Sequence, residues 1–131
     1  MTTLRILVVD DDAAVRRTLD RALGRAGHTV VLAASGEQAC EILQAGTEVD
    51  VVLMDLRMPT MSGRTLFQMI LAQWPVLAGR LAVMSGDPEA EDHAAWMSLH
   101  DLPVLPKPFS LAEVYATIDS LARAERKKAN G

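Results

Sequence analysis

Residues 4–12 read Leu4-Arg5-Ile6-Leu7-Val8-Val9-Asp10-Asp11-Asp12, a short apolar run that ends on three carboxylates. Branched aliphatic residues dominate this run, which is the composition of a strand that is buried on both faces. Residues 13–26 then place apolar side chains at helical spacing and charged side chains on the opposite face. A buried strand followed at once by an amphipathic helix predicts an α/β fold with a parallel sheet.

The same strand–helix unit recurs to the end of the chain. Further strands are predicted at residues 29–33, 50–54, 81–84 and 102–105. Helix starts are predicted at five capping signals: Asp12, Ser35 with Gln38, Ser62, Asp87 before Pro88, and Ser110 with Glu113. We therefore predict a doubly wound, five-stranded parallel sheet in the order 2-1-3-4-5, with five helices on both faces, which is the flavodoxin-like arrangement.

The chain has 131 residues, which is the length of one domain with a single hydrophobic core. We predict that this domain spans residues 1–123 and that residues 124–131 form a basic, frayed tail. The last predicted helix directs four apolar side chains inward: Leu111, Val114, Ile118 and Leu121. Trp96 and Met97 on the preceding helix are expected to pack in the core.

Charge is distributed unevenly along the chain. Arg123–Gly131 carries four basic residues and one acid, whereas residues 1–122 carry nine basic and sixteen acidic residues. Such an acidic body argues against nucleic acid as a ligand, because phosphate contacts supply most of the affinity for nucleic acid. No apolar run is long enough to span a membrane, and no signal peptide follows Met1. The single Cys40 cannot form an internal disulfide, so we expect a cytoplasmic protein in which Cys40 is buried.

Polar side chains follow four of the predicted strands. Asp10 and Asp11 follow the first strand, Asp55 the third, Ser85 the fourth and Lys107 the fifth. In the predicted strand order these residues meet at one edge of the sheet, where three carboxylates would repel one another without a cation. Mg²⁺ is suited to such a site because it binds a few carboxylates together with water and a phosphate oxygen. A lysine and a hydroxyl suit the phosphate oxygens, so the set indicates a carboxylate that accepts a phosphoryl group.

Four segments of the chain resemble the receiver domain of two-component response regulators: Ile6–Asp11, Asp55–Gly63, Ser85-Gly86 and Lys107-Pro108-Phe109. The resemblance covers roughly residues 4–122. Its most specific part is Asp55–Gly63, which places an aspartate, Met-Pro, Met and Gly in register. The resemblance implies a phosphoprotein of phosphorelay signal transduction. We expect a signalling domain and not an enzyme, although it would accelerate the loss of its own phosphoryl group.

The resemblance also implies a role for each site residue. Asp55 would be the phosphoacceptor that becomes an aspartyl phosphate. Asp11 and Asp55 would bind Mg²⁺ directly, Asp10 would act largely through water, and the backbone carbonyl of Arg57 would be a further ligand. Mn²⁺ is expected to substitute for Mg²⁺ in this magnesium site.

The resemblance also implies how the phosphoryl group is bound, where it comes from and how the signal is passed on. Ser85 would take the place of the switch hydroxyl, Lys107 would contact the phosphoryl group, and the Lys107–Pro108 bond would be cis. Phosphate would come from a histidine kinase or a histidine phosphotransfer protein. The signal would pass to a downstream protein through the face made by the fourth helix, the fifth strand and the fifth helix.

Three features depart from the commonest form of the family. Val104 stands where the family usually has an aromatic switch residue, and residues 100–103 lack the usual Gly-Ala pair. Arg57 and Asp87, each two residues beyond a site residue, flank the mouth of the site in the family. We hypothesise that they pair across this mouth and restrict the water that hydrolyses the acyl phosphate, with a stabilisation under about 1 kcal/mol.

Two alternative functions stay open. Asp10-Asp11-Asp12 also fits the D-x-D pattern of haloacid-dehalogenase-like phosphatases, with Asp10 as nucleophile and Asp12 as general acid and base. That interpretation leaves Asp55 and its loop unexplained. A phosphorylation-independent adaptor is the other alternative, and the complete set of acceptor-site residues argues against it.

Overall fold

The computed structural model describes the backbone of residues 3–87 and 91–130 and the side chains of residues 3–87 and 94–123. Strands and helices alternate in this order: β1 (Arg5–Val9), α1 (Ala13–Arg25), β2 (Thr29–Ala33), α2 (Gly36–Gln44), β3 (Val51–Asp55), α3 (Gly63–Gln73), the 3₁₀ turn η1 (Pro75–Leu77), β4 (Leu81–Ser85), α4 (Glu91–Leu99), β5 (Val104–Pro106) and α5 (Leu111–Asn130). The predicted alternation is confirmed. The predicted start of the fourth helix reaches into residues 88–90, which lie outside the described residues.

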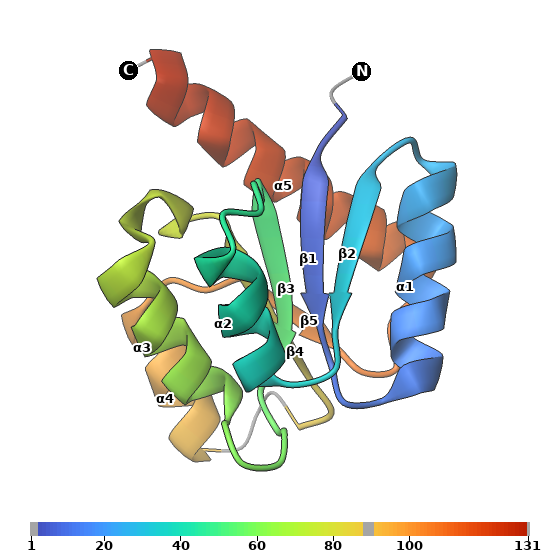
Figure 1. Cartoon of the computed structure of the whole chain (residues 1–131). Helices are drawn as coiled ribbons and strands as arrows, with labels where there is room; N and C mark the ends of the chain where they lie inside the picture. The colour runs from blue at the N-terminus through green and yellow to red at the C-terminus, as the bar shows by residue number, and fades with distance from the viewer. Residues whose placement is uncertain (1–2, 88–90, 131) are drawn as a thin grey trace.

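The sheet has five strands in the order β2-β1-β3-β4-β5, and each neighbouring pair is parallel, as predicted. β1 lies between β2 and β3, so that Val9 pairs with Ala33 on one side and with Met54 on the other. The strands end together at the lower edge of the sheet in Figure 1. Because the chain leaves β1 toward β2 and leaves β3 toward β4, the switch point of the sheet lies between β1 and β3.

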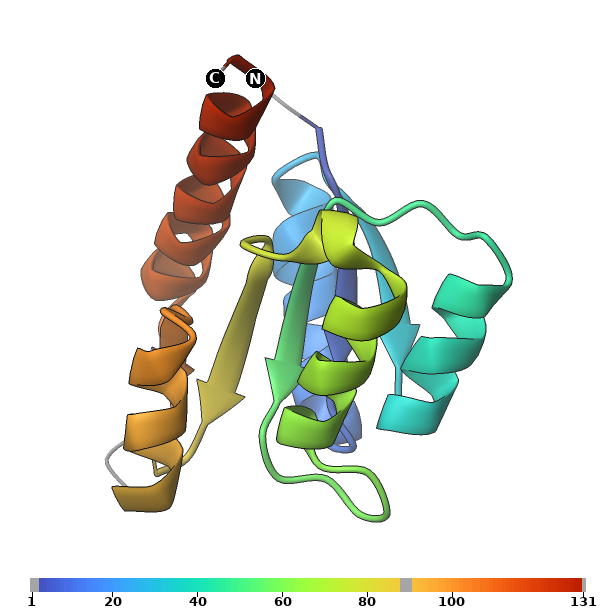
Figure 2. The same cartoon turned by 90° about the vertical axis from the view of Figure 1, so that its left-hand side faces the viewer.

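Helices cover both faces of the sheet (Figures 1 and 2): α1 and α5 lie on one face, and α2, α3 and α4 on the other. The alternation of side chains along β1 supplies both cores. Ile6 and Val8 pack with α1 and α5, whereas Leu7 and Val9 pack with the other three helices. All four are fully buried, so β1 is fixed rigidly and the residues that follow it are placed with it.

The core agrees with the sequence except at one position. Trp96, Met97 and Cys40 are buried as predicted. Leu111 is 46% exposed, so the prediction that it points inward is wrong. It is the first residue of α5, and the contact of this helix with the core begins one turn later at Val114.

The ends of some elements also differ from the prediction. β5 begins at Val104, two residues later than expected, because the amide of Leu102 donates to the carbonyl of Met97 at the end of α4, at 3.0 Å. Pro103 has no amide hydrogen and contributes only its carbonyl, which accepts from the Val83 amide at 3.0 Å. α5 continues helically to Asn130, through the segment where a tail is predicted. The domain boundary at residue 123 stays a prediction.

Side-chain caps begin four helices as predicted: Asp12, Ser35, Ser62 and Ser110 each accept a hydrogen bond from an amide in the first turn of their helix. At α5 the capping box is complete, since the Ser110 amide also donates to Glu113 Oε1 at 3.0 Å. Within the described part of the chain, no helix combines the length and apolar character needed to cross a membrane.

Candidate functional site

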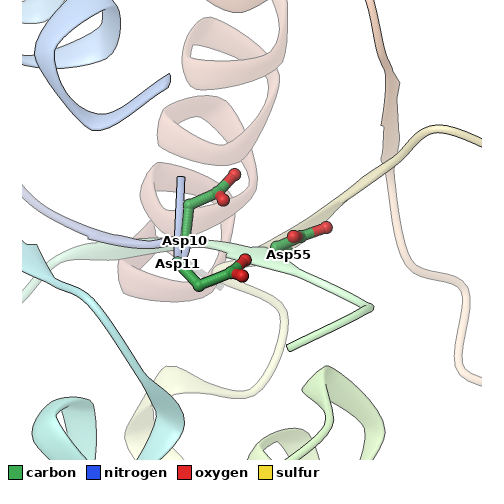
Figure 3. Close-up of side chains that lie close together, drawn as sticks. All are labelled: Asp10, Asp11 and Asp55. Atoms are coloured by element: carbon green, nitrogen blue, oxygen red, sulfur yellow. The ribbon is translucent and has the colours of Figure 1, made fainter. Parts of the chain in front are cut away.

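Three carboxylates gather beyond the carboxyl ends of β1 and β3. One oxygen from each of Asp10, Asp11 and Asp55 lies within 4.8 Å of the others. Figure 3 shows Asp10 and Asp11 extending from the chain after β1 and Asp55 from β3, with their oxygens directed to the same side. Asp10 and Asp55 are buried, and Asp11 is exposed. The prediction that the three carboxylates converge at the switch point is confirmed.

Lys107 supplies the cation nearest to these carboxylates among the described residues. Its Nζ lies 2.7 Å from Asp10 Oδ2 and 3.5 Å from Asp55 Oδ2. The second oxygen of Asp10 accepts a hydrogen bond from the Asp12 amide at 2.9 Å. Asp10 is therefore well compensated although its side chain is fully buried, whereas Asp55 receives a longer contact from the same ammonium group.

The burial of Asp55 is the main reason that its pKa is raised above the ordinary value, and the charge of Asp10 raises the pKa further, while Lys107 lowers it. For Lys107, burial by itself would lower the pKa, but the hydrogen bond to Asp10 and the charges of both carboxylates raise it above the ordinary value. Lys107 is thus a stable cation. The pKa of Asp55 stays raised although Lys107 lowers it, so a second cation near Asp55 would further stabilise its ionised form.

Ser85 ends β4 next to this group and is buried. Its carbonyl accepts a hydrogen bond from the Lys107 amide at 2.7 Å, which holds the start of the lysine loop against β4. Its Oγ accepts from the Asp87 amide at 3.1 Å. Because that bond uses the hydroxyl as an acceptor, the hydroxyl proton remains for an acceptor at the site.

The Lys107–Pro108 peptide is cis, as the resemblance implies. The predicted ion pair between Arg57 and Asp87 is absent from the described residues, where both side chains are exposed. Exposed ion pairs gain little over solvation, so nothing forces these two charges together. The backbone of Arg57 nevertheless contributes to the site, because its amide favours the ionised form of Asp55 and opposes the rise in pKa of Asp55.

Two further contacts at the site were not predicted from the sequence. Arg16, which the helical pattern assigns to the polar face of α1, donates from Nη1 to the Asp10 carbonyl at 2.6 Å. Gly63 packs so closely on the β3 end that a Cβ there would overlap the Asp55 carbonyl oxygen. Gly63 belongs to the segment Asp55–Gly63 that carries the family resemblance, so the sequence does contain a signal for this glycine. Nothing in the helical spacing distinguishes Arg16 from its neighbours.

The donor set fits a hard divalent cation. It consists of oxygen ligands only, it places one exposed carboxylate beside two buried ones, and it retains excess negative charge after Lys107 is counted. Mg²⁺ binds through one or two carboxylates and keeps several waters, which an open site with one exposed carboxylate allows. Asp12, by contrast, uses its carboxylate to cap α1 and accepts from the Ala14 amide at 2.9 Å, so the phosphatase alternative is not favoured.

A sequence model of the response regulator receiver domain matches residues 6–119 of the chain. The DNA-binding transcriptional regulator NtrC of Proteus hauseri is 36% identical over 116 residues, which cover 87% of this chain and 24% of NtrC. Response regulator MprA of Mycobacterium ulcerans (strain Agy99) is 34% identical over 121 residues, which cover 92% of this chain and 51% of MprA. The chain therefore spans about a quarter of one relative and about half of the other.

Solved structures show the same architecture. A response regulator receiver protein from Pseudomonas putida is 30% identical and superposes with a TM-score of 0.79, over 91% of this chain and 98% of that one.

Proposed function

We propose, from the premise that this chain belongs to the response regulator receiver domain family, that Asp55 is the residue that accepts the phosphoryl group in two-component signalling. The observation that carries the proposal is the cluster of Asp10, Asp11 and Asp55 within 4.8 Å, with Lys107 Nζ 3.5 Å from the Asp55 carboxylate. Of the two buried aspartates, Asp55 is the one that Lys107 compensates less closely, so its oxygen is the freer nucleophile.

Mg²⁺ would be held by Asp11, Asp55 and the Arg57 backbone carbonyl, with Asp10 acting through a water molecule, and Mn²⁺ would serve in its place. When bound, the metal supplies positive charge to the oxygens of the phosphoryl group in transfer. The exposure of Asp11 supports this assignment, because that side of the cluster is open to water and to an incoming phosphate.

The remaining roles in phosphoryl transfer belong to Asp55, Lys107 and Ser85. A carboxylate oxygen of Asp55 forms a bond to phosphorus as the bond from phosphorus to the donor breaks, in line with it. Lys107 stays protonated because its pKa is raised, so it offsets charge on the phosphoryl oxygens as well as on Asp10. The Ser85 hydroxyl, whose proton is not used by Asp87, donates to a phosphoryl oxygen.

The donor would be a histidine kinase or a histidine phosphotransfer protein. Phosphorylation would bias the face formed by α4, β5 and α5, where a downstream protein binds, and half-buried Val104 of β5 occupies the position of the usual aromatic switch residue. In the relatives this domain makes up part of a longer protein, and NtrC is described as DNA-binding. We propose that the part of the chain described here binds protein and not nucleic acid, acts in the cytoplasm, and catalyses no reaction beyond its own dephosphorylation.

A mass measurement tests the proposal. The protein is incubated with Mg²⁺ and a small phosphodonor, and the intact mass is measured for wild type, Asp55→Asn, Asp10→Asn and the control Asp20→Asn, which alters an exposed carboxylate on α1. One added phosphoryl group in wild type and in the control, and none in Asp55→Asn, is the expected result. Turnover of donor that Asp10→Asn abolishes would instead favour a phosphatase. No modification and no turnover in wild type would favour an adaptor.

A further inference from the structure

The loop from β3 to α3 leaves the site at Asp55 and carries Arg57, whose carbonyl is a proposed metal ligand. Its tip is Thr60, which has a φ of 64°. This is the left-handed region, which β-branched residues seldom adopt without support from their surroundings. The Met61 amide donates to the Pro59 carbonyl at 2.7 Å and closes the turn around Thr60, and contacts outside the loop add to this local bond.

The first turn of α2 supplies one such contact. Thr60 Oγ1 lies 2.6 Å from Glu37 Oε2 and 2.6 Å from the carbonyl oxygen of Pro59. The hydroxyl has one proton to donate, and a carboxylate is a stronger acceptor than a neutral carbonyl. The bond to Glu37 therefore ties the tip of the loop to a helix that lies 23 residues earlier in the sequence.

The next loop residue rests on the same turn of α2. The Met61 side chain packs so closely on Gly36 that a Cβ at residue 36 would lie 2.7 Å from Met61 Sδ. The helix beneath is itself fixed in the core through Ala39 and Leu43, both of which are buried. Two consecutive loop residues thus contact two consecutive residues of a firmly packed helix.

The base of the loop is closed on the site. The Gly63 amide donates to the Leu56 carbonyl at 2.9 Å, and Gly63 lies directly against the Asp55 backbone. Arg57 is located between this fixed base and the tip that α2 holds. The position of its carbonyl therefore depends on both attachments.

We propose that Glu37 is a positioning residue of the site, which holds Thr60, fixes the loop that presents the Arg57 carbonyl, and thereby sets the affinity for Mg²⁺. The inference rests on the proposed function. Glu37 does not touch the reacting atoms and acts only through Thr60. Loss of one exposed, charge-assisted hydrogen bond changes an equilibrium by roughly threefold to tenfold.

Calorimetric titration with Mg²⁺ measures the effect. Glu37→Ala and Thr60→Val should each weaken Mg²⁺ binding by roughly threefold to tenfold. The double variant should bind Mg²⁺ no more weakly than the weaker of the two single variants, because both changes remove the same bond. Glu37→Gln keeps an acceptor oxygen but loses the charge, so its affinity for Mg²⁺ should lie between those of wild type and Glu37→Ala. Glu41→Ala removes an exposed carboxylate one turn further along α2 and controls for the loss of negative charge.

Hydrogen exchange of the amides of residues 57, 58, 60 and 61 in the metal-free protein tests the attachment separately from the metal. Exchange should be several-fold faster in Glu37→Ala and Thr60→Val than in wild type and Glu41→Ala. If Glu37→Ala matches Glu41→Ala in both affinity and exchange while wild type is phosphorylated, Glu37 has no positioning role and the proposed function stands. If wild type binds no Mg²⁺, the proposed metal site fails, and the exchange result alone decides whether Glu37 holds the loop.

Discussion

The ammonium group of Lys107 lies 2.7 Å from a carboxylate oxygen of Asp10, whose side chain is fully buried. This pair joins the loop after the last strand to the end of the first strand, across the switch point of the sheet. It also explains why Asp55 differs from Asp10 in its surroundings, since the same ammonium group lies 3.5 Å from Asp55.

Removal of the ammonium group should destabilise the fold. Lys107→Ala leaves Asp10 buried without its closest cation, and we expect a loss of about 3 kcal/mol in the free energy of unfolding. Urea denaturation at neutral pH measures this loss, and Arg21→Ala serves as the control because Arg21 is an exposed cation on α1. Mg²⁺ should restore part of the stability. A loss of stability as small as that of the control would show that buried Asp10 does not depend on Lys107 for charge compensation.

Removal of the Asp55 charge should have the opposite effect in metal-free protein. Burial and the charge of Asp10 raise the pKa of Asp55, so its ionised form is disfavoured in the folded state. This cost is absent below the pKa of the unfolded chain and appears as pH rises through the folded-state pKa. Asp55→Asn should therefore raise the Tm at neutral pH, by roughly 3–5 °C for each 1 kcal/mol regained.

Thermal denaturation of Asp55→Asn and Asp20→Asn, with and without Mg²⁺, checks this expectation. The gain of Asp55→Asn should vanish in acid, where Asp55 is protonated in both states, and should shrink when Mg²⁺ stabilises the wild type. A lower Tm for Asp55→Asn than for Asp20→Asn in neutral, metal-free buffer would show that the negative charge at residue 55 is already compensated.

The affinity for Mg²⁺ should decrease in mild acid. Metal binding requires the ionised carboxylate, and the raised pKa of Asp55 lets protons compete at a higher pH than they would for an ordinary aspartate. Below the folded-state pKa we expect affinity to fall by about tenfold per pH unit. Lys107 remains charged throughout, because its pKa is raised. Calorimetric titrations in weakly acidic and neutral buffers measure the slope, and a flat profile would mean that Asp55 does not ligate the ion.

Gly63 should tolerate no side chain. A Cβ at residue 63 would overlap the Asp55 carbonyl oxygen and lie 2.8 Å from Leu56 Cα, and both neighbours are backbone atoms that cannot move aside. We expect Gly63→Ala to cost about 2 kcal/mol or more. Gly24→Ala is the matched control, because a Cβ there meets nothing within 4 Å and alanine favours the helix, so it should stabilise by about 0.5–1 kcal/mol. Equal denaturation midpoints for the two variants would refute the packing argument.

Much of the fold was predictable because its signals are local. The apolar run before Asp10 predicts a strand buried on both faces, and the caps at Ser35 and Ser110 fix where helices begin. The convergence of Asp10 with Asp55 was predictable from strand order, since parallel strands end at one edge. These features depend on periodicity and on neighbours in sequence, which a single sequence contains.

The features that were not predicted arise from contacts between distant segments. Exposed Leu111 has the same spacing as buried Val114, and only the position of α5 on the sheet distinguishes them. The bond from Thr60 to Glu37 joins two surface positions that no pattern connects. Arg57 and Asp87, which flank the mouth of the site in the family, form no ion pair within the described part of the chain, and both are exposed.

The bond between Lys107 and Asp10 joins residues that lie 97 positions apart in a chain of 131 residues. During synthesis of the chain, Asp10 and Asp55 emerge well before the lysine that compensates them. Until β5 docks on the edge of the sheet, these two carboxylates lack the ammonium group that contacts them and must stay hydrated. Completion of this carboxylate cluster with its lysine therefore coincides with completion of the sheet, and a local opening of the three-residue edge strand β5 would separate Lys107 from the carboxylates.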